Sequence, residues 1–597
     1  MESPKLRRIL RGGILVFSGL VFSLPLWSYQ TYEALSPQIR EARRLYALGG
    51  RAFPLTAFPL TAETLGEIAG ELVRDPRLNP DLRLAAAALL ESLPLPRAQG
   101  EVLTGADLGA DLEGALAGDF VVEPVRWFYD RFVAYPDFFK LKTYVQKKDL
   151  PGLQFSLGLK RIYRTGEIPP HNLFYTPNDW MSLENFMIRS GFFAWQNQGF
   201  EIRLGRSPVH YGDPRWTGFL PSWRLPYLDA LEYRYRWGNW EMVSSVSVLD
   251  NRMGEEERDF FTSGGSLASY GSPDRIYLGS NRKGGDSWFY LAPPSSDPSA
   301  PPLGAENKLS LGFGQTIILN ALHRFTWRNR FLSLGITGNM VAARENNALH
   351  LADIFPVFSW HNAEVGGHNF SLVAEALWTI LPGLDLYLQA AYDDISATDL
   401  LGIADTAIPT IDAYLLGLGW ETGLAGRPLS VRLEAGVTHY LWGSFHAYDE
   451  AKGNYLGRAI YRYRAQKETR IMPLTSPYGP GARWLELNLA LGSGSSGLNL
   501  RRDPLGPLAL ELNLSYLDHL EGVDLIRLDY PGPASLKNAP RLGSFSSGLT
   551  LVYTLPGGGP NSAAFYGAAG LNAVEGRWWP EFRLGARWRG TFLRREV

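Results

Sequence analysis

The segment from Leu228 to Leu249 alternates apolar and polar positions with a period of two. One parity carries Leu231, Tyr233, Tyr235 and Trp237, and the other carries Glu232, Arg234 and Arg236. That period belongs to a β-strand with one apolar and one charged face. The Trp-Gly-Asn-Trp sequence at 237–240 turns the chain back, and the alternation resumes behind it. This segment therefore predicts an antiparallel hairpin.

Two classes of protein contain such a hairpin. In a membrane barrel, a charge on the lipid face at mid-depth costs about 2–4 kcal/mol, so the charged parity must face an aqueous interior. The aromatic side chains near the turn resemble one section of the girdle that such barrels carry at the membrane interface. A soluble sheet with a wet outer face shows the same alternation, so the hairpin alone fits both classes.

The connections between strands separate these two classes. Sixteen amphipathic strands can be placed between residues 152 and 593. The tight turns fall at 197–199, 237–239, 382–383, 424–428 and 556–560, and the connections between them are mostly long. Short turns at one end and long loops at the other are typical of outer-membrane barrels. We therefore predict a mainly β protein, a transmembrane antiparallel up-and-down β-barrel of sixteen to eighteen strands.

The N-terminal part follows a different pattern. Basic residues precede an apolar run at 14–24, which predicts a signal peptide over residues 1–28. Helices are expected at 36–48, 61–74 and 80–93, the first with serine at the N-cap and proline at the first helical position. An even strand count places both ends of the barrel on the periplasmic side. We therefore expect a small N-terminal α-helical periplasmic domain at 29–118, with its own core, followed by the barrel at 119–597.

Composition excludes several functions. The chain has 58 basic and 60 acidic residues, so no basic excess is available to neutralise nucleic-acid phosphates. It has no cysteine, which excludes disulfides and thiolate metal sites. No Gly-rich phosphate loop, His-Glu-x-x-His or Gly-x-Ser-x-Gly motif is present, and the nine histidines show no metal-site spacing. We predict no cofactor, no metal, no nucleic-acid partner and no enzymatic activity.

The richest group of functional side chains is expected inside the proposed barrel, near the third to fifth strands. Sugars are bound by planar polar side chains and aromatic faces, and acidic polysaccharides also by arginine forks. The same charges could instead pair with one another and fill a plugged barrel, and both interpretations remain open. The candidate polysaccharide-binding residues are Arg203, Arg206, His210, Tyr211, Asp213, Arg215, Trp216, Arg224, Arg234 and Arg236.

Three segments resemble the Wzi-type capsule assembly family of outer-membrane barrels. They are TYEALSPQIREARRLYALGG followed by FPLTAETLGEIAGEL, then RLGRSPVHYGDPRWTGFLPSWRLPYLDALEYRY, then HLADIFPVFSWHN with the hairpin after it. The chain departs from the family at Tyr211-Gly212-Asp213, where Trp-Gly-Pro is expected, and at Phe355-Pro356, where Asn-Pro is expected. After the third segment, Asp393-Asp394 matches the family's closing acidic pair and is expected to cap a loop, because adjacent strand residues point to opposite faces.

The resemblance implies a function. A protein of this kind would help to assemble or attach capsule or another surface polysaccharide, by non-covalent binding. Its partners would be outer-membrane lipid, the surface polysaccharide and, during biogenesis, the barrel-assembly machinery. A porin-like channel for small solutes or oligosaccharides is the alternative, since a barrel of this size can enclose an aqueous lumen. An outer-membrane hydrolase is a third, more remote possibility, because no nucleophile with a base and an orienting partner is recognisable.

Overall fold

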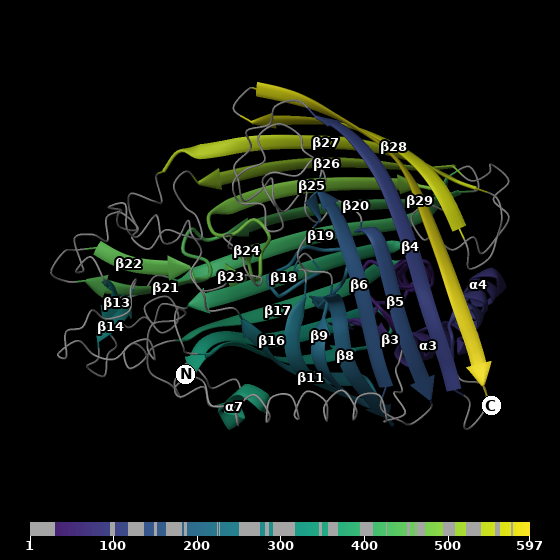
Figure 1. Ribbon diagram of the computed structural model, residues 1–597, viewed down its shortest axis with the longest axis horizontal. Helices are drawn as coiled ribbons and strands as arrows, with labels where there is room; N and C mark the ends of the chain where they lie inside the picture. The colour runs from purple at the N-terminus through teal and green to yellow at the C-terminus, as the bar shows by residue number, and fades with distance from the viewer. Residues whose placement is uncertain are drawn as a thin grey trace, which may run out of the picture.

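Eighteen antiparallel strands close into a barrel in the computed structural model (Figure 1), which confirms the predicted fold class. Neighbours in sequence are neighbours in the sheet, and the ring closes where β29 pairs with β4. The strands are β4 (Val102–Ala117), β5 (Asp137–Lys147), β6 (Gly152–Ile162), β8 (Ile188–Asn197), β9 (Phe200–Ser207), β11 (Leu228–Trp237), β12 (Trp240–Leu249), β15 (Ile317–Arg328), β16 (Leu332–Arg344), β17 (His368–Leu381), β18 (Leu384–Asp394), β19 (Ile411–Leu424), β20 (Arg427–Thr438), β25 (Ala482–Leu491), β26 (Leu508–Leu520), β27 (Arg541–Thr554), β28 (Ser562–Val574) and β29 (Arg577–Glu596).

The structure describes most of the chain. The described residues are 30–95, 102–117, 137–147, 152–162, 182–183, 188–223, 225, 227–249, 275–280, 286–290, 317–344, 349–355, 368–394, 410–424, 427–449, 454–459, 462–463, 472–492, 508–520, 539–555, 562–574 and 577–596. The predicted signal peptide and Arg224 lie outside them.

Two barrel strands come in addition to the sixteen placed from the sequence. They are β4 and β5, which pair with each other and continue the ring on either side. The first of them lies inside the range 29–118 that we assigned to a helical domain. The helical part therefore ends before residue 102, and the barrel begins there.

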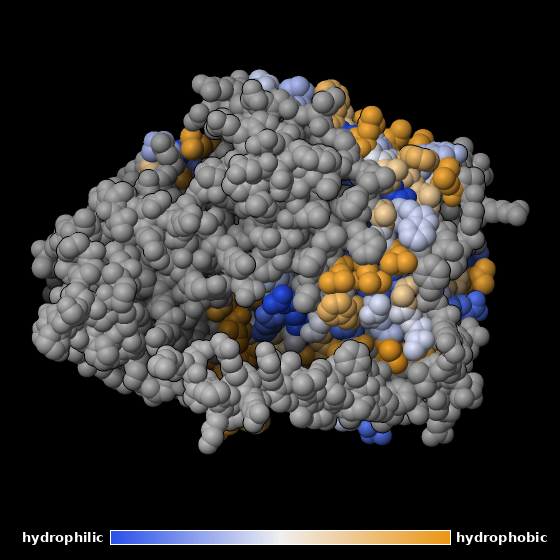
Figure 2. Space-filling view, in the orientation of Figure 1, coloured by the Kyte–Doolittle hydropathy of each residue, from blue (hydrophilic) through white to orange (hydrophobic). Residues whose placement is uncertain are grey.

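The outer face of the barrel is apolar. Along β19, Tyr414, Leu416, Leu418 and Trp420 are exposed, whereas Ala413 and Leu415, which have the other parity, are buried. Orange side chains gather over the outer face at the right of the molecule (Figure 2). A membrane-crossing barrel must hydrogen-bond its strand backbones within the sheet and present apolar side chains to lipid. The closed ring and its apolar outer face meet both requirements.

Aromatic rings mark the short-turn end of this apolar face. Tyr235 and Trp237 stack at a ring-centroid distance of 5.3 Å beside the 238–239 turn. On the neighbouring strands, Trp240 lies 6.4 Å from Trp327. This arrangement agrees with the interfacial girdle predicted from the hairpin.

Residues 30–95 form a plug at the short-turn end of the barrel. The plug consists of β1 (Thr31–Tyr32), α2 (Pro37–Leu48), β2 (Thr56–Phe58), β3 (Leu60–Thr61), α3 (Ala62–Arg74) and α4 (Pro80–Ser92), and the three helices confirm those expected from the sequence. None of the helices among the described residues has the length and apolar character needed to cross a membrane. Two backbone hydrogen bonds tie the plug to barrel turns: Gly383 N–H donates to Ala47 O at 2.7 Å, and Ala52 N–H to Arg330 O at 2.8 Å.

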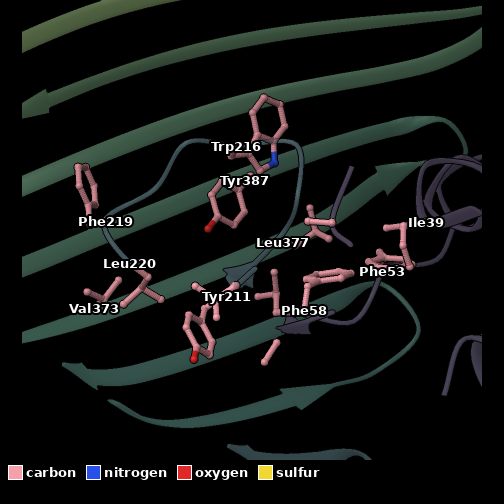
Figure 3. Packing of buried hydrophobic residues seen from close by; sticks show 14 of the residues in the cluster. Ile39, Phe53, Phe58, Tyr211, Trp216, Phe219, Leu220, Val373, Leu377 and Tyr387 are labelled. Atoms are coloured by element: carbon pink, nitrogen blue, oxygen red, sulfur yellow. The ribbon is translucent and has the colours of Figure 1, made fainter. Parts of the chain in front are cut away.

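The plug does not pack a core of its own, contrary to the interpretation as a separate helical domain. Its apolar side chains share one buried cluster with the inner barrel wall and with the segment between β9 and β11 (Figure 3). That segment contains β10 (His210–Gly212), which pairs with β2 of the plug. Farther along it, Trp216 stacks on Tyr387 of β18 at 5.9 Å with an interplanar angle of 9°. The lumen next to the plug is therefore a packed interior.

Short elements lie at the opposite, long-loop end. The hairpin β13–β14 (Arg275–Ser280, Asp286–Tyr290) packs near the hairpin β21–β22 (Ser444–Asp449, Asn454–Ala459) (Figure 1). The remaining strands, each of two residues, are β7 (Ser182–Leu183), β23 (Arg462–Tyr463) and β24 (Met472–Pro473).

Asp393 accepts hydrogen bonds from the Asn369 side chain at 2.7 Å and from Gly443 N–H at 2.9 Å. This carboxylate fixes a loop, as expected for the Asp393-Asp394 pair.

One short helix covers part of the outer face. Helix α7 (Leu351–Ile354) lies against β12 and β15. Ser244 and His323 have the parity of lipid-facing residues, yet both are buried beneath α7. The Ser244 hydroxyl donates to Ile354 O at 2.7 Å, and His323 Nε2 lies 3.0 Å from Ala352 O. The backbone of α7 therefore satisfies polar groups that would otherwise face hydrocarbon.

Candidate functional site

A buried ion-pair cluster joins the plug to the barrel wall. Arg43 of α2 donates from Nε to both carboxylate oxygens of Asp213, at 2.9 and 2.7 Å. Its Nη1 lies 3.6 Å from Asp385 of β18, and Arg215 donates to the same Asp385 at 2.9 Å. The Arg43, Asp213 and Asp385 side chains are at most 3% exposed. Because buried charges must be paired, this cluster fixes α2 against the wall.

The charges around Asp213 compensate for its burial. Burial alone would raise the pKa of this carboxyl, but the adjacent Arg43 and Arg215 hold the pKa of Asp213 below its ordinary value. Arg215 N–H also donates to Asp213 Oδ1 at 3.0 Å, which favours the ionised form further. Asp213 is therefore a carboxylate inside the protein. It links the plug, the segment between β9 and β11 (the inward segment, residues 208–227) and, through the arginines, β18.

A second cluster is built on β9 and β11. Arg203 donates to Pro59 O at 2.9 Å and is paired with Glu232, and Arg234 donates to Ala57 O at 2.6 Å. Glu201 lies 3.5 Å from Arg203 and 3.7 Å from Arg234. These arginines therefore bind the backbone of the plug while carboxylates of the same two strands balance their charge.

Two further ion pairs lie at the short-turn rim. Arg236 of β11 donates to Glu67 of α3 at 2.7 Å, and Arg328 of β15 donates to Glu71 of α3 at 3.0 Å. All four side chains are partly exposed to solvent, which weakens each pair. The barrel wall therefore contacts the plug both at the short-turn rim and in the buried interior.

The structure brings most of the predicted site residues together. They contact one another and the plug, and most of them do not line an open site. Tyr211 donates to Glu232 at 3.0 Å, and the His210 ring lies 5.8 Å from that of Phe58. Six of the ten are buried: Arg203, His210, Tyr211, Asp213, Trp216 and Arg234. Of the two open interpretations, these contacts support the one in which lumen charges pair and fill a plugged barrel.

Arg206 stands apart from the other candidates. It has the parity of outward-facing side chains near the long-loop end of β9, pairs with Asp229 at 2.8 Å, and lies 3.8 Å above the Tyr227 ring. The expectation that it lies inside the barrel is therefore wrong.

Several residues that join the plug to the wall, or that form buried polar contacts in the wall beside it, were not singled out from the sequence. Arg43, Arg324, Glu375 and Asp385 are all buried ion-pair members, and Glu434 accepts hydrogen bonds from Thr217 N–H at 3.1 Å and Trp484 Nε1 at 2.8 Å. The wall residues among them could have been found, because each has inward parity in a strand whose other face is apolar. Arg43 carried no such signal, since a helical arginine is ordinarily solvated.

A cavity of about 270 Å³ remains between the plug and the wall. Helix α2, the inward segment and strands β19, β20, β25 and β26 surround it. Its lining is Ala34, Leu35, Arg40, Arg43, Arg44, Pro214, Arg215, Thr217, Trp223, Glu421, Ser430, Arg432, Asn488, Ala490, Glu511 and Asn513. Among the predicted site residues, Arg215 reaches this cavity. The lining combines arginine, amide, carboxylate and indole groups, which can hydrogen-bond to and stack on a polar ligand.

The described part of the chain contains no group of three or more His, Cys, Asp or Glu side chains that could hold a metal ion.

Comparison with known proteins concerns the fold. No protein family and no curated protein matches the chain. Among solved structures, it is similar to Wzi of Escherichia coli, an outer-membrane protein involved in group 1 capsule assembly and described as a carbohydrate-binding β-barrel, with 12% identity, a TM-score of 0.49, and coverage of 94% of this chain and 98% of that chain. It is also similar to OccK1 of Pseudomonas aeruginosa, with 9% identity, a TM-score of 0.39, and coverage of 82% of this chain and 99% of that one. OprD of the same organism gives 10% identity, a TM-score of 0.38, and coverage of 82% and 95%. The barrel described above, apolar outside and polar within, is the fold of an outer-membrane protein.

Proposed function

We propose that this protein is a non-catalytic outer-membrane anchor that binds a capsular or other surface polysaccharide during assembly of the cell surface. The observation that carries the proposal is the plug, whose helices and buried ion pairs fill the lumen beside the wall. A barrel plugged in this way is suited to presenting a rigid binding surface. The resemblance of three sequence segments to the Wzi-type family supports the same role, as does the sugar-compatible lining of the cavity.

An anchor of this kind needs membrane, biogenesis and sugar partners. Outer-membrane lipid would contact the apolar outer face, and the barrel-assembly machinery would insert the chain after export by its signal peptide. Of the nine selected residues that the structure describes, Arg215 alone lines the cavity, and we propose that it can contact sugar. The six buried ones would act indirectly, by holding the plug.

Deletion of the gene in the source organism tests the proposal. We expect the total amount of surface polysaccharide to stay the same while the cell-attached fraction falls and the released fraction rises. Complementation with the full chain should restore attachment. The proposal fails if the attached fraction is unchanged in the deletion strain, or if total synthesis falls in proportion to attachment.

A solute channel is the second candidate, and one observation favours it. A Cβ atom added at Gly548, which lies at an inward position of β27, would meet no atom within 4 Å, so space remains beside this part of the wall. Single-channel recording of the purified protein in a planar bilayer separates the two functions. A persistent ohmic conductance would favour transport, and silence would favour the anchor.

A further inference from the structure

The cavity between α2 and the wall has an ordered polar floor. Inward residues of neighbouring strands stand in register there, with Arg432, Asn488 and Asn513 in one row and Ser430, Ala490 and Glu511 in the next. Asn488 donates from its side-chain nitrogen to Glu511 at 3.0 Å, and Asn513 does so at 3.4 Å. Asn513 and Glu511 are nevertheless exposed toward the lumen. The floor therefore keeps donors and acceptors available for a ligand.

Three arginines that line the cavity have guanidinium nitrogens that make no hydrogen bond. Within the described part of the chain, Nη1 of Arg43, Nε and Nη1 of Arg215, and Nε of Arg432 are buried and make no hydrogen bond. All three side chains line the cavity. These guanidinium groups beside the cavity therefore retain donors that no acceptor of the described residues satisfies by a hydrogen bond.

The charges of the cavity nearly cancel. Arg44 pairs with Glu41 at 2.6 Å, Arg43 with Asp213, Arg215 with Asp385 at 2.9 Å, and Arg432 with Glu486 at 3.6 Å. Arg40 interacts electrostatically with Glu511, and Glu421 lies 4.0 Å from Arg215. With Arg587, which also interacts electrostatically with Arg40, six arginines thus have six carboxylates beside them. The cavity therefore has no excess positive charge with which to attract an anionic ligand.

The remaining features limit the size and shape of the ligand. Trp223 adds an indole surface to the lining, and the face of a sugar ring that carries C–H groups can pack on such a surface. The volume of about 270 Å³ is just below the range of about 300–1,000 Å³ typical of small-molecule sites. A ligand of one or two rings fits, and each hydroxyl group would supply both a donor and an acceptor.

From these observations we infer that the cavity is a subsite for an uncharged sugar unit, and that it discriminates against the corresponding uronic acid. The inference rests on the proposed polysaccharide-binding function and names the chemistry of the unit bound. Hydroxyl groups would accept from the arginines and share hydrogen bonds with Asn488, Asn513 and Glu511. A carboxylate in the same place would lie beside existing carboxylates without a surplus cation.

Titration calorimetry on the full chain in detergent micelles tests the inference. The probes are the methyl glycosides of glucose, galactose and mannose, each with its matching methyl uronate. We expect at least one neutral glycoside to bind, and its uronate to bind at least tenfold more weakly. Binding of no glycoside, or binding of a uronate as tightly as its neutral counterpart, would overturn the inference.

Variants locate the site. Asn513→Leu and Asn488→Leu should each weaken binding of the neutral glycoside by at least tenfold, because both amides lie on the exposed floor. The matched control is Thr326→Val, an inward polar residue of β15 that does not line this cavity. If both floor variants bind as the wild type does, the sugar lies elsewhere and the inference is wrong.

The outcome separates this inference from the proposed function. Loss of polysaccharide attachment on gene deletion, together with no glycoside binding, would reject the subsite and leave the anchor. Glycoside binding without any effect of the deletion on attachment would reject the anchor and leave the sugar site.

Discussion

Arg43→Met tests the buried contact between the plug and the barrel. The substitution removes the partner that gives Asp213 three hydrogen bonds, two from Nε at 2.9 and 2.7 Å and one from Nη2, and that lies 3.6 Å from Asp385. Loss of one partner of a buried pair costs about 3–5 kcal/mol, because the remaining charge is left without compensation. Arg215 still contacts both carboxylates, so we expect the lower figure of about 3 kcal/mol.

Hydrogen exchange measures this loss where it occurs. A cost of about 3 kcal/mol corresponds to an increase of about a hundredfold in the population of the opened plug. The amides of α2 should exchange faster by that factor, while those of β19 and β20 keep their wild-type rates. The control, Arg77→Met, removes an arginine that is 62% exposed and should change exchange by less than about fivefold. Exchange in α2 within threefold of wild type in the Arg43→Met variant would refute the assigned role of this ion pair.

Three further predictions concern other parts of the molecule. Burial lowers the pKa of His210 to about 4 from the ordinary 6.5, so the unfolded chain takes up a proton first as the pH falls. The contribution of His210 to the free energy of unfolding should be complete above pH 6.5 and fall by about 3 kcal/mol toward pH 4. Urea unfolding of the His210→Phe variant should lack this part of the pH dependence. His323→Leu removes the contact with Ala352 O, so proteolysis within 349–355 should accelerate, and an unchanged cleavage rate would show that α7 does not depend on it. A Cβ at Gly417 would lie 2.9 Å from the Trp216 ring, so Gly417→Val should displace that ring. The fluorescence of Trp216, taken as the difference between a protein and its Trp216→Phe counterpart, should then shift in wavelength. The same difference spectrum with Gly417 and with Val at this position would contradict the close contact.

The sequence predicted the barrel because its strands carry their information locally. In β11, the alternation of Tyr233 and Tyr235 with Arg234 and Arg236 is the alternation between the outer face and the lumen. The plug helices were also predictable, since Thr61 caps α3 by accepting from Thr64 N–H at 3.1 Å. Local periodicity and capping chemistry are visible without knowledge of tertiary contacts.

The first barrel strand was missed because its pattern is ambiguous. Leu108, Leu112 and Leu116 of β4 recur every four residues. That spacing places side chains on one face of a helix and also on one face of a strand, since four is a multiple of two. Glycine at 105, 109 and 114 would have argued against the helix.

The location of the plug could not be predicted from its own sequence. An amphipathic helix shows that one face is buried, but it does not show what covers that face. Arg43 and Asp213 lie 170 residues apart, so their pairing depends on the closed barrel. For Arg206 the information was present, because it follows Arg203 by three positions and a period of two places the two on opposite faces.

Cross-linking tests most directly whether the N-terminal segment plugs the lumen. The chain has no cysteine, and the Thr56 hydroxyl of the plug donates to Glu241 of β12 at 2.6 Å, with both side chains buried. In the Thr56→Cys, Glu241→Cys double variant, a short bifunctional thiol reagent applied to outer membranes should cross-link the two positions in most molecules, while each single variant remains uncross-linked. Absence of the cross-link, in a variant whose barrel is folded and inserted, would contradict a plug held inside the barrel.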